Sequence, residues 1–340
     1  MKAIVCEGSF PAEHEQSLID VTRERPSPRP RDLLVEVRAV SVNPVDAKVR
    51  AGGGPSGSSE GDKILGWDAA GIVTAVGREV TRFQVGDEVY YAGAINRSGS
   101  YAEYQVVDER LVGRKPANIG FAEAAALPLT TITVWEMLFD RLKVRRDQQA
   151  GSESLLIVGG AGGVGSIATQ LARQLTGFTV IASASRPETA AWSREMGAHH
   201  VVDHRKPLAA QVKAIVPGGV TCVLGLTRTE DHFDEIVEAL EPQGALALIE
   251  SPASPLDINK LKPKSASLHW EFMFTRSLYE TADMRQQGEL LDQVSALVDA
   301  GRIRTTMRLN LGRINASNLR RAHAMIESGT TIGKIVLEGF

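Results

Sequence analysis

The residues with the most specific chemical potential form a glycine-rich turn at residues 159–165. Gly160, Gly162 and Gly165 fit the pattern G-x-G-x-x-G, and the turn directly follows an apolar run at residues 155–158. Apolar residues then recur at helical spacing. In a strand–turn–helix unit of this kind, glycines allow a tight turn, a close approach of the backbone to a pyrophosphate and close helix packing. The pattern therefore predicts a dinucleotide site at the start of the helix.

We expect the turn and the first helical residues to bind the cofactor. The expected cofactor-binding residues of this turn are Gly160, Gly162, Gly163, Val164 and Gly165. A phosphate-binding loop of the ATPase type is excluded, because serine and isoleucine stand where lysine and Ser/Thr would be needed.

The segment after the next predicted strand indicates which nicotinamide cofactor is bound. An NAD-specific site places Asp or Glu about 20 residues beyond the glycines, whereas this chain has Ser183, Ser185 and Arg186 there and no acid. Hydroxyls beside a guanidinium suit a 2′-phosphate, so we predict a preference for NADPH. Ser185 also fits a capping box with Glu188, in a helix beginning at Pro187, and both roles can hold together.

The whole chain has the composition of a globular protein. It has 340 residues, of which 43% are hydrophobic and 23% charged, and this length predicts two domains. The formal net charge of -3 argues against a nucleic-acid or anionic-membrane partner. Only two cysteines are present, too few for a disulfide framework, so we expect a reducing, cytoplasmic location. The uncharged stretch 154–172 is interpreted as buried strand, turn and helix rather than as a membrane span.

The order of the predicted elements divides the chain. Short alternating strands separated by glycines dominate the first 125 residues and predict a mostly-β, partly open barrel. Apolar runs then alternate with helical periods, which predicts a doubly wound parallel sheet of the Rossmann type, in an α/β fold. We expect residues 126–275 to form this dinucleotide-binding domain, inserted in a catalytic domain of residues 1–125 and 276–340. Residues 51–61 are low in apolar side chains and are predicted to form a mobile surface loop.

A family resemblance rests on three motifs together. The glycine turn, Val85-Gly86-Asp87-Glu88-Val89 and Ala124-Ala125-Ala126-Leu127-Pro128 resemble the medium-chain dehydrogenase/reductase superfamily, and most closely its quinone oxidoreductase-like branch, which includes proteins labelled zinc-type alcohol dehydrogenase-like. The resemblance covers essentially the whole chain. It implies a GroES-like catalytic domain, an inserted Rossmann domain, an active-site cleft between them and a homodimer.

The catalytic zinc ligands of this superfamily are absent at the matched positions. The resemblance places the Cys, His and Cys ligands of the zinc-dependent branch at Asn43, Trp67 and Leu129. Tryptophan and leucine cannot bind zinc, and asparagine is a poor substitute, so we predict no catalytic metal. The histidines of residues 199–204 are interpreted as polar residues that flank a strand rather than as a metal site.

Without zinc, a conjugated carbonyl is an easier hydride acceptor than a simple ketone, because charge spreads onto its oxygen as an enolate. We therefore predict an oxidoreductase that uses NADPH to reduce an enone, an enal or a quinone as its small-molecule substrate. Three catalytic candidates come from the matched motifs. Asn43 could hold the substrate oxygen or cap a turn, Tyr91 could be a donor near the cleft or pack in the core, and Thr133 could contact the nicotinamide or begin a helix.

Residues 267–274 alternate between an aromatic face and a polar face. Trp270 and Phe272 are candidates for the wall of a flat substrate's pocket, with His269 as a proton donor and Trp67 filling the space vacated by the metal. The resemblance favours a second role for this segment, a sheet edge paired between two subunits. Two other functions stay open: an alcohol dehydrogenase with unmatched zinc ligands, and a nucleotide-binding protein without enzymatic activity.

Overall fold

The chain forms two compact units. The computed structural model describes residues 1–53, 63–146, 151 and 153–340. One unit comprises Met1–Ile132 together with Phe274–Phe340, and the other comprises Thr133–Met273. Of the loop predicted at residues 51–61, residues 54–61 lie outside the described part of the chain.

The second unit is built on a parallel sheet of six strands in the order β11-β10-β9-β12-β13-β14. This is the strand order 3-2-1-4-5-6 of the dinucleotide-binding fold, which reverses direction on either side of its first strand. The central strands β9, β10 and β12 are short, mostly apolar and buried, as a sheet covered on both faces requires. Their bounds are β9 Ser154–Val158, β10 Thr179–Ser183, β11 His200–Val202, β12 Val220–Gly225, β13 Leu240–Leu248 and β14 Ser267–Trp270.

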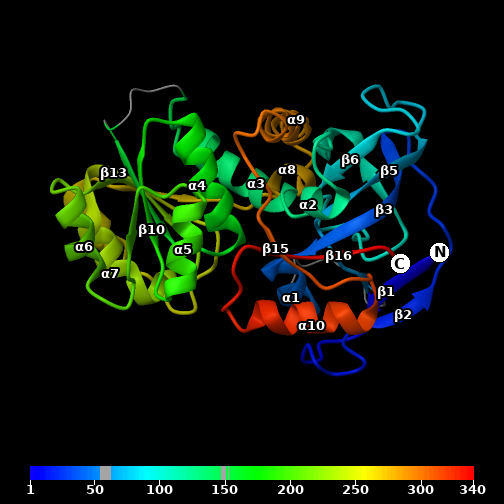
Figure 1. Cartoon of the computed structure of the whole chain (residues 1–340), viewed down its shortest axis with the longest axis horizontal. Coiled ribbons are helices and arrows are strands. Elements are labelled where there is room, and N and C mark those ends of the chain that lie inside the picture. Colours follow the sequence, from blue (N-terminus) through cyan, green and yellow to red (C-terminus); the bar gives the residue numbers. More distant parts are fainter. Residues whose placement is uncertain (54–62, 147–150, 152) are drawn as a thin grey trace. The chain divides into compact units, whose positions relative to one another are not determined.

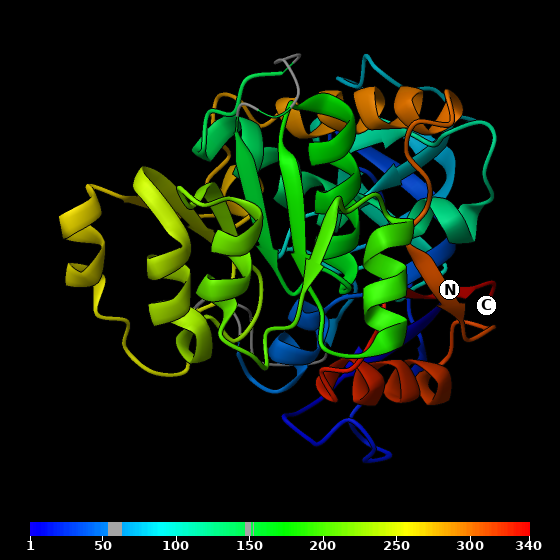
Figure 2. The ribbon, with the colours of Figure 1, turned by 60° about the vertical axis from the view of Figure 1, so that its left-hand side comes forward.

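Helices cover both faces of this sheet (Figures 1 and 2). Helices α4 (Gly163–Leu175) and α5 (Pro187–Glu195) lie on one face, and α6 (Leu208–Ile215) and α7 (Thr229–Ala239) on the other. Apolar side chains of α6 and α7 form one buried core with the strands, in which Val212, Phe233 and Ile236 meet Leu156 and Val223. A 3₁₀ segment, Ile258–Lys264, leads into β14.

The first unit contains two further sheets, which are mostly antiparallel and have three and seven strands. One has the order β2-β1-β4, and the other has the order β15-β16-β3-β5-β6-β8, with β7 also paired to β3. Nearly all residues of β3 are buried, and only Glu36 and Arg38 are partly or fully exposed, so the strand is covered more completely than a period of two predicts. The strands are β1 Lys2–Cys6, β2 Ile19–Thr22, β3 Asp32–Val42, β4 Lys63–Ile64, β5 Ala69–Val76, β6 Glu88–Tyr91, β7 Tyr104–Asp108, β8 Val112–Arg114, β15 Met307–Asn310 and β16 Lys334–Glu338.

Short helices connect and cover these sheets. Helix α1 begins at Pro44, where the missing N–H and fixed backbone angle of proline suit a first helical turn. Helix α3 and a following π-helical turn, Glu136–Arg141, carry the chain from one unit into the other. The helices are α1 Pro44–Arg50, α2 Phe121–Ala125, α3 Pro128–Trp135, α8 Thr275–Leu278, α9 Gln286–Asp299 and α10 Ala316–Glu327, with a 3₁₀ turn at Glu109–Leu111.

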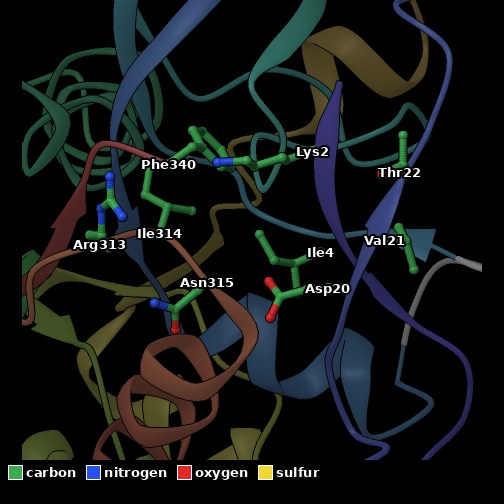
Figure 3. Close-up of a pocket in the computed structure, with 9 residues that line it drawn as sticks. All are labelled: Lys2, Ile4, Asp20, Val21, Thr22, Arg313, Ile314, Asn315 and Phe340. Atoms are coloured by element: carbon green, nitrogen blue, oxygen red, sulfur yellow. The ribbon is translucent and has the colours of Figure 1, made fainter.

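A cavity of about 360 Å³ lies in the first unit, between the two ends of the chain (Figure 3). Lys2 and Asp20 line it from β1 and β2, and Arg313 and Asn315 line it from the segment before α10. Both basic side chains of this cavity belong to exposed residues.

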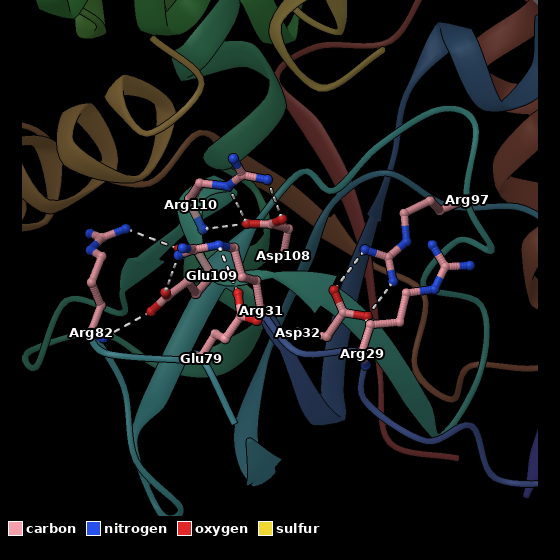
Figure 4. A network of polar contacts seen from close by, with 9 residues as sticks. All are labelled: Arg29, Arg31, Asp32, Glu79, Arg82, Arg97, Asp108, Glu109 and Arg110. Carbon is pink, nitrogen blue, oxygen red and sulfur yellow. Dashed lines mark hydrogen bonds and ion pairs between the residues drawn. The ribbon is translucent and has the colours of Figure 1, made fainter. Parts of the chain in front are cut away.

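Contacts between arginines and carboxylates gather around the start of β3, at Asp32 (Figure 4). Asp32 is buried, and Arg97 donates to its two oxygens at 2.9 and 2.7 Å. Burial alone would raise the pKa of this carboxyl, but the bidentate arginine turns the shift into a lowering. Glu109 is also buried and accepts the backbone N–H groups of Thr81 and Arg82 at 2.9 and 2.8 Å.

Two further observations concern the whole described chain. Cys6 and Cys222 are both buried and unbridged. Among the residues described, no helix combines the length and the apolar character that crossing a membrane requires.

Candidate functional site

The glycine turn joins the end of β9 to the start of α4, and its glycines are required for different reasons. A Cβ atom at Gly165 would lie 2.3 Å from the carbonyl oxygen of Gly159, and one at Gly160 would lie 2.7 Å from the Cβ of Ala182 in β10. A Cβ at Gly162 would have nothing nearer than 3.7 Å. Two of the motif glycines therefore serve packing, whereas Gly162 leaves open space at the helix N-terminus.

That open N-terminus has the properties of an anion site. Gly162 is the N-cap of α4 and has no side chain to bind the first backbone N–H groups, those of Gly163, Val164 and Gly165. The helix runs for 13 residues, so its dipole adds a partial positive charge at this end.

Ser183 connects this turn to the next strand. It is buried at the end of β10, and its Oγ accepts a hydrogen bond from the N–H of Gly159 at 3.0 Å. The carbonyl oxygen of Ser183 accepts from Gly160 at 3.1 Å. Its hydroxyl also lies 3.3 Å from Nδ1 of His204, a residue that the sequence prediction did not include.

In the segment after β10, the capping box differs from the predicted one. Helix α5 does begin at Pro187, but its N-cap is Arg186, whose N–H donates to Thr189 Oγ1 at 3.1 Å. The Arg186 guanidinium lies 3.3 Å from the Glu188 carboxylate and is part exposed. Ser185 is half-buried just before the cap. The prediction placed the cap one residue too early. Ser185 and Glu188 fit the capping-box pattern in the sequence, but in the structure the Thr189 side chain accepts the hydrogen bond from the Arg186 N–H.

In the first unit, three buried polar side chains meet where β3, β5 and β16 come together. Lys334 opens β16, Asp68 directly precedes β5, and Asn43 directly follows β3. The Lys334 ammonium donates to Asn43 Oδ1 and to the carbonyl oxygen of Val42, and lies 3.1 Å from Asp68 Oδ2. Lys334 is 3% exposed and Asp68 0%. We call Asn43, Asp68 and Lys334 the lysine cluster.

Further hydrogen bonds hold Asn43 and Asp68 within the lysine cluster. Asn43 Nδ2 donates to Asp68 Oδ2 at 2.8 Å, and Asp68 Oδ1 accepts the backbone N–H of Leu129 at 2.8 Å. Burial raises the pKa of Asp68, while Lys334, Asn43 and the Leu129 N–H oppose that shift. The other contact of Asn43 Nδ2, to the carbonyl oxygen of Ser41, is long at 3.5 Å.

A second buried chain of polar groups begins beside the lysine cluster. Asp46 Oδ2 accepts the N–H of Asn43 at 2.6 Å, and burial raises the pKa of Asp46 to about 7. The hydroxyl of Tyr101 faces this carboxyl and lies 3.2 Å from Nε2 of His323. Arg50 Nε donates to Nδ1 of the same imidazole at 3.3 Å. Burial and the neighbouring guanidinium lower the pKa of His323 to about 3, so its ring is neutral.

The other predicted residues of the first unit are Trp67 and Tyr91. Trp67 is buried, its Nε1 donates to the carbonyl oxygen of Ala94 at 3.2 Å, and its ring contacts Phe274 edge to face. Tyr91 is buried on β6, in register with the first residue of β5. Burial raises the pKa of Tyr91, and its hydroxyl has no hydrogen-bond partner among the described residues.

The remaining predicted residues belong to the second unit. Thr133 is buried near the end of α3, so it does not begin that helix. Residues 267–274 form a strand only as far as Trp270. His269 is half-buried with Nε2 3.1 Å from Ser267 Oγ, and burial lowers the pKa of His269. Trp270 and Phe272 are 51% and 42% exposed. None of the predicted site residues lines the cavity of Figure 3.

Comparisons with known proteins agree with this architecture. Residues 29–117 match the model of the alcohol dehydrogenase GroES-like domain, and residues 196–337 match that of zinc-binding dehydrogenases. A zinc-type alcohol dehydrogenase-like protein of Staphylococcus aureus is 39% identical over 99% of both chains. A quinone oxidoreductase of Pseudomonas aeruginosa is 31% identical over 91% of this chain and 92% of its own length.

Solved structures agree as well. A crystal structure from Rhizobium etli CFN 42, named for zinc-dependent alcohol dehydrogenases, is 53% identical with a TM-score of 0.95, covering 100% of this chain and 98% of its own. The structure of mycobacterial Rv1454c complexed with NADPH is 27% identical with a TM-score of 0.85, covering 100% of both chains. The chain belongs to the medium-chain dehydrogenase/reductase superfamily. Within it, the relatives place the chain in the quinone oxidoreductase-like branch.

Names within this superfamily imply a zinc ion, and the donor atoms of this chain do not fit one. At the matched ligand positions, Asn43 Oδ1 is bonded to the Lys334 ammonium, Trp67 is bonded to a backbone carbonyl, and Leu129 has no donor side chain. A buried ammonium at this place repels a second cation. In the part of the chain that the structure describes, no three His, Cys, Asp or Glu side chains are grouped to hold a metal.

Sequence reasoning missed Lys334, Asp68 and His204. Lys334 opens an apolar strand and Asp68 precedes another, so each showed only as a charge beside a buried run. Nothing in their local sequence indicates that they meet, because β16 and β5 are paired only through β3. His204 belongs to the histidine-containing segment 199–204, which the sequence analysis interpreted as polar residues flanking a strand. In the structure the histidines of this segment have different partners: His199 accepts from the backbone N–H of Val180, whereas His204 lies against the Ser183 hydroxyl.

Proposed function

We propose that the chain is an NADPH-dependent oxidoreductase that transfers hydride to an enone, an enal or a quinone without catalytic zinc. The observation that carries this proposal is the lysine cluster. The Lys334 ammonium is bonded to the oxygen atoms of Asn43 and Asp68 that could otherwise bind a metal, and it places a positive charge there itself. Reaction at a conjugated acceptor fits such a site, because it needs hydrogen-bond donors rather than a Lewis acid.

The second unit, expected from the sequence to span residues 126–275, is proposed to bind the dinucleotide. The N–H groups of Gly163, Val164 and Gly165 would hold the pyrophosphate, with Gly160 and Gly162 shaping the turn. Ser183, Ser185 and Arg186 would hold the 2′-phosphate, because this segment has no acid. The NADPH complex of a relative supports this choice. When bound, the cofactor supplies the hydride.

Hydride addition to the β-carbon of an enone moves an electron pair onto the carbonyl oxygen, and a proton then completes the product at the α-carbon. Asn43 is our candidate donor to that oxygen. Its second N–H is held only by the long 3.5 Å contact to Ser41, and the ammonium on its Oδ1 polarises the amide and strengthens this donor.

Tyr91 is the second candidate donor. A buried hydroxyl without a partner costs free energy, and a substrate oxygen would supply the missing partner. Thr133 on the nicotinamide side, and Trp67, His269, Trp270 and Phe272 at the substrate, complete the proposed site.

NADPH oxidation by chelator-treated protein, measured against a panel of enones, enals and quinones, tests the proposal. We expect turnover that persists without metal and does not rise when zinc is added. Tyr91→Phe should lower kcat without lowering stability, because the lost hydroxyl has no partner in the described structure. Activity that appears only with stoichiometric zinc would instead establish the zinc-dependent alcohol dehydrogenase that the relatives' names favour.

The exposed edge of the parallel sheet supports a homodimer as the proposed assembly. β14 is the last strand of that sheet, and Trp270 on it is half exposed. The two unbridged cysteines are compatible with a reducing, cytoplasmic location, which also remains a proposal.

A further inference from the structure

A pair of histidines lies beside the proposed cofactor site and has no role in it so far. His204 follows β11 by two residues, and His232 lies in the first turns of α7, directly after β12. Their ring centroids are 5.6 Å apart, with the rings tilted by 55°. Both side chains are half-buried. We call His204 and His232 the histidine pair.

The place of the histidine pair in the fold is where a doubly wound sheet binds nucleotides. β10 and β11 extend the sheet on one side of β9, and β12 extends it on the other. The carboxyl ends of these parallel strands share one edge, and the crevice between oppositely directed connections is the usual ligand position. His204 and His232 therefore approach this crevice from its two sides.

Ser183 connects the histidine pair to the glycine turn. Its Oγ accepts from the N–H of Gly159 at 3.0 Å and lies 3.3 Å from Nδ1 of His204. When the imidazole of His204 is protonated, its Nδ1–H must donate to Ser183 Oγ. The serine's own hydroxyl hydrogen is then left for a ligand. In the neutral tautomer that carries its hydrogen on Nε2, Ser183 donates to Nδ1. One proton added to that tautomer gives a positive charge and also releases the serine hydroxyl as a hydrogen-bond donor.

The charges around the histidine pair are arranged so that a bound anion would change its protonation. Three neighbouring arginines already have carboxylates: Arg186 contacts Glu188, Arg205 contacts Asp203 and Arg228 contacts Asp231. Neither histidine has a carboxylate hydrogen-bond partner among the described residues. Each can therefore bind an added anion without first breaking an ion pair.

The groups that face each histidine together oppose its protonation when no anion is bound. Burial lowers the pKa of His204, and His232, Arg205 and Arg228 lower it further against the opposing effect of Asp203. Burial likewise lowers the pKa of His232, where Arg228 adds to the effect and Asp231, Glu235 and Glu230 oppose it. A phosphate dianion at this place would reverse the balance, because it favours the charged imidazole.

We propose that His204, supported by His232, is a specificity residue for the adenosine 2′-phosphate of NADPH, and that the histidine pair takes up a proton when this phosphate binds. The inference rests on the proposed NADPH-dependent function and deepens it. NADPH and NADH differ only in this phosphate, so the ratio of their affinities isolates the effect. The ratio should favour NADPH more strongly at low pH, because protonated imidazoles bind the phosphate better.

Calorimetric titration of the full chain with NADPH and with NADH, at pH 6.5 and pH 8.0, tests the inference. The NADPH preference should be at least threefold greater at pH 6.5, with a limit of about thirty-fold for one proton over this interval. Titrations in buffers of different ionisation heat should show net proton uptake with NADPH and none with NADH. The uptake by the histidine pair should exceed the release from the 2′-phosphate, because that group has a second pKa of about 6 and is mostly the dianion at pH 6.5.

Variants separate the charge from the hydrogen bond. His204→Asn keeps a hydrogen-bonding group near Nδ1 but cannot take up a proton, so it should remove most of the pH dependence and weaken NADPH binding at pH 6.5 while leaving NADH binding unchanged. His232→Gln should reduce the same dependence. His200→Gln is the matched control. His200 is exposed and lies at the amino end of β11, whereas His204 follows the carboxyl end of the same strand. Thermal unfolding of each variant checks that it is folded.

Three results would count against these proposals in distinguishable ways. A wild-type preference for NADPH that is equal at both pH values overturns the histidine inference alone. Unchanged proton uptake in a folded His204→Asn variant overturns it as well. Binding of neither dinucleotide overturns the proposed function, and the inference with it.

Discussion

At Lys334 the chain buries a charge that most protein cores avoid. Taking an ammonium and a carboxylate out of water costs several kcal/mol for each ion, and good geometry is needed to repay it. Here Lys334 reaches two oxygens besides the Asp68 carboxylate, and Asp68 accepts two further hydrogen bonds. The pair is therefore satisfied as a unit, and the loss of one member should be far more harmful than the loss of both.

Lys334→Met tests this at the scale of one residue. The substitution leaves Asp68 buried without its cation, and we expect the free energy of unfolding to fall by about 3–5 kcal/mol. The double variant Lys334→Met/Asp68→Asn should recover part of this loss, because no charge is then left in the core. Urea unfolding monitored by tryptophan fluorescence measures both values.

The exposed Lys206 provides the control for this prediction. Lys206→Met should leave the free energy of unfolding within about 0.5 kcal/mol of the wild type. A single Lys334 variant as stable as the wild type would show that the buried pair does not hold the ends of β3, β5 and β16 together.

At the scale of elements, the strand–turn–helix unit of β9 and α4 shows how one motif combines packing and binding. Gly160 and Gly165 have no room for a side chain, whereas Gly162 has room. A backbone that must pack and a backbone that must admit a phosphate both require glycine, so the sequence pattern alone does not separate the two roles.

Alanine substitutions at two of these glycines separate the roles. Gly165→Ala should lower the free energy of unfolding by about 1–3 kcal/mol, because its Cβ would overlap the Gly159 carbonyl oxygen. Gly162→Ala should leave stability almost unchanged and weaken NADPH binding, because the methyl group occupies space proposed for the pyrophosphate. Thermal unfolding and calorimetric titration measure the two effects.

One result for the two glycine variants would contradict this prediction. A Gly162→Ala variant that binds NADPH as tightly as the wild type would argue against a pyrophosphate at this helix N-terminus. The packing role of Gly165 would be unaffected by that result.

The predicted elements differ in how well local sequence specified them. The strand β3 is one of the short alternating strands expected in the first 125 residues, but most of its residues are buried, so neighbouring elements rather than the period of two decide its burial. The expectation for residues 267–274 was wrong beyond Trp270, although the alternation continues to Phe274. There Glu271 is buried and contacts Arg141 at 2.9 Å, so an ion pair rather than the apolar pattern decides which side chain lies inside.

At the scale of the whole molecule, the edge of the parallel sheet is the feature that supports the proposed homodimer. β14 ends the sheet, and an edge strand presents unpaired N–H and C=O groups to another chain. Trp270 and Phe272 add exposed aromatic surface to the same segment. A second copy placed by a two-fold axis would cover both the edge and the aromatic rings.

Trp270→Arg tests the proposed dimer. The wild-type chain should have the mass of a dimer in light scattering after size exclusion, and the variant should shift toward the monomer because a buried guanidinium without a partner opposes association. Tyr279→Arg is the control, since Tyr279 is an exposed aromatic residue of the other unit. A monomeric wild type, or a dimer unaffected by Trp270→Arg, would refute this interface.

The sequence by itself determined the local elements and the class of the fold. Apolar periodicity and the glycine spacing specify β9, its turn and α4, and the quoted motifs identify the superfamily, because each of these signals acts over a few neighbouring residues. The tertiary structure alone decided which distant side chains meet. Lys334 is bonded to Asn43 only because β16 pairs with β3, and His204 approaches His232 only because the sheet places β11 and β12 on opposite sides of β9. Contacts of that kind depend on strand order, which no local pattern of residues encodes.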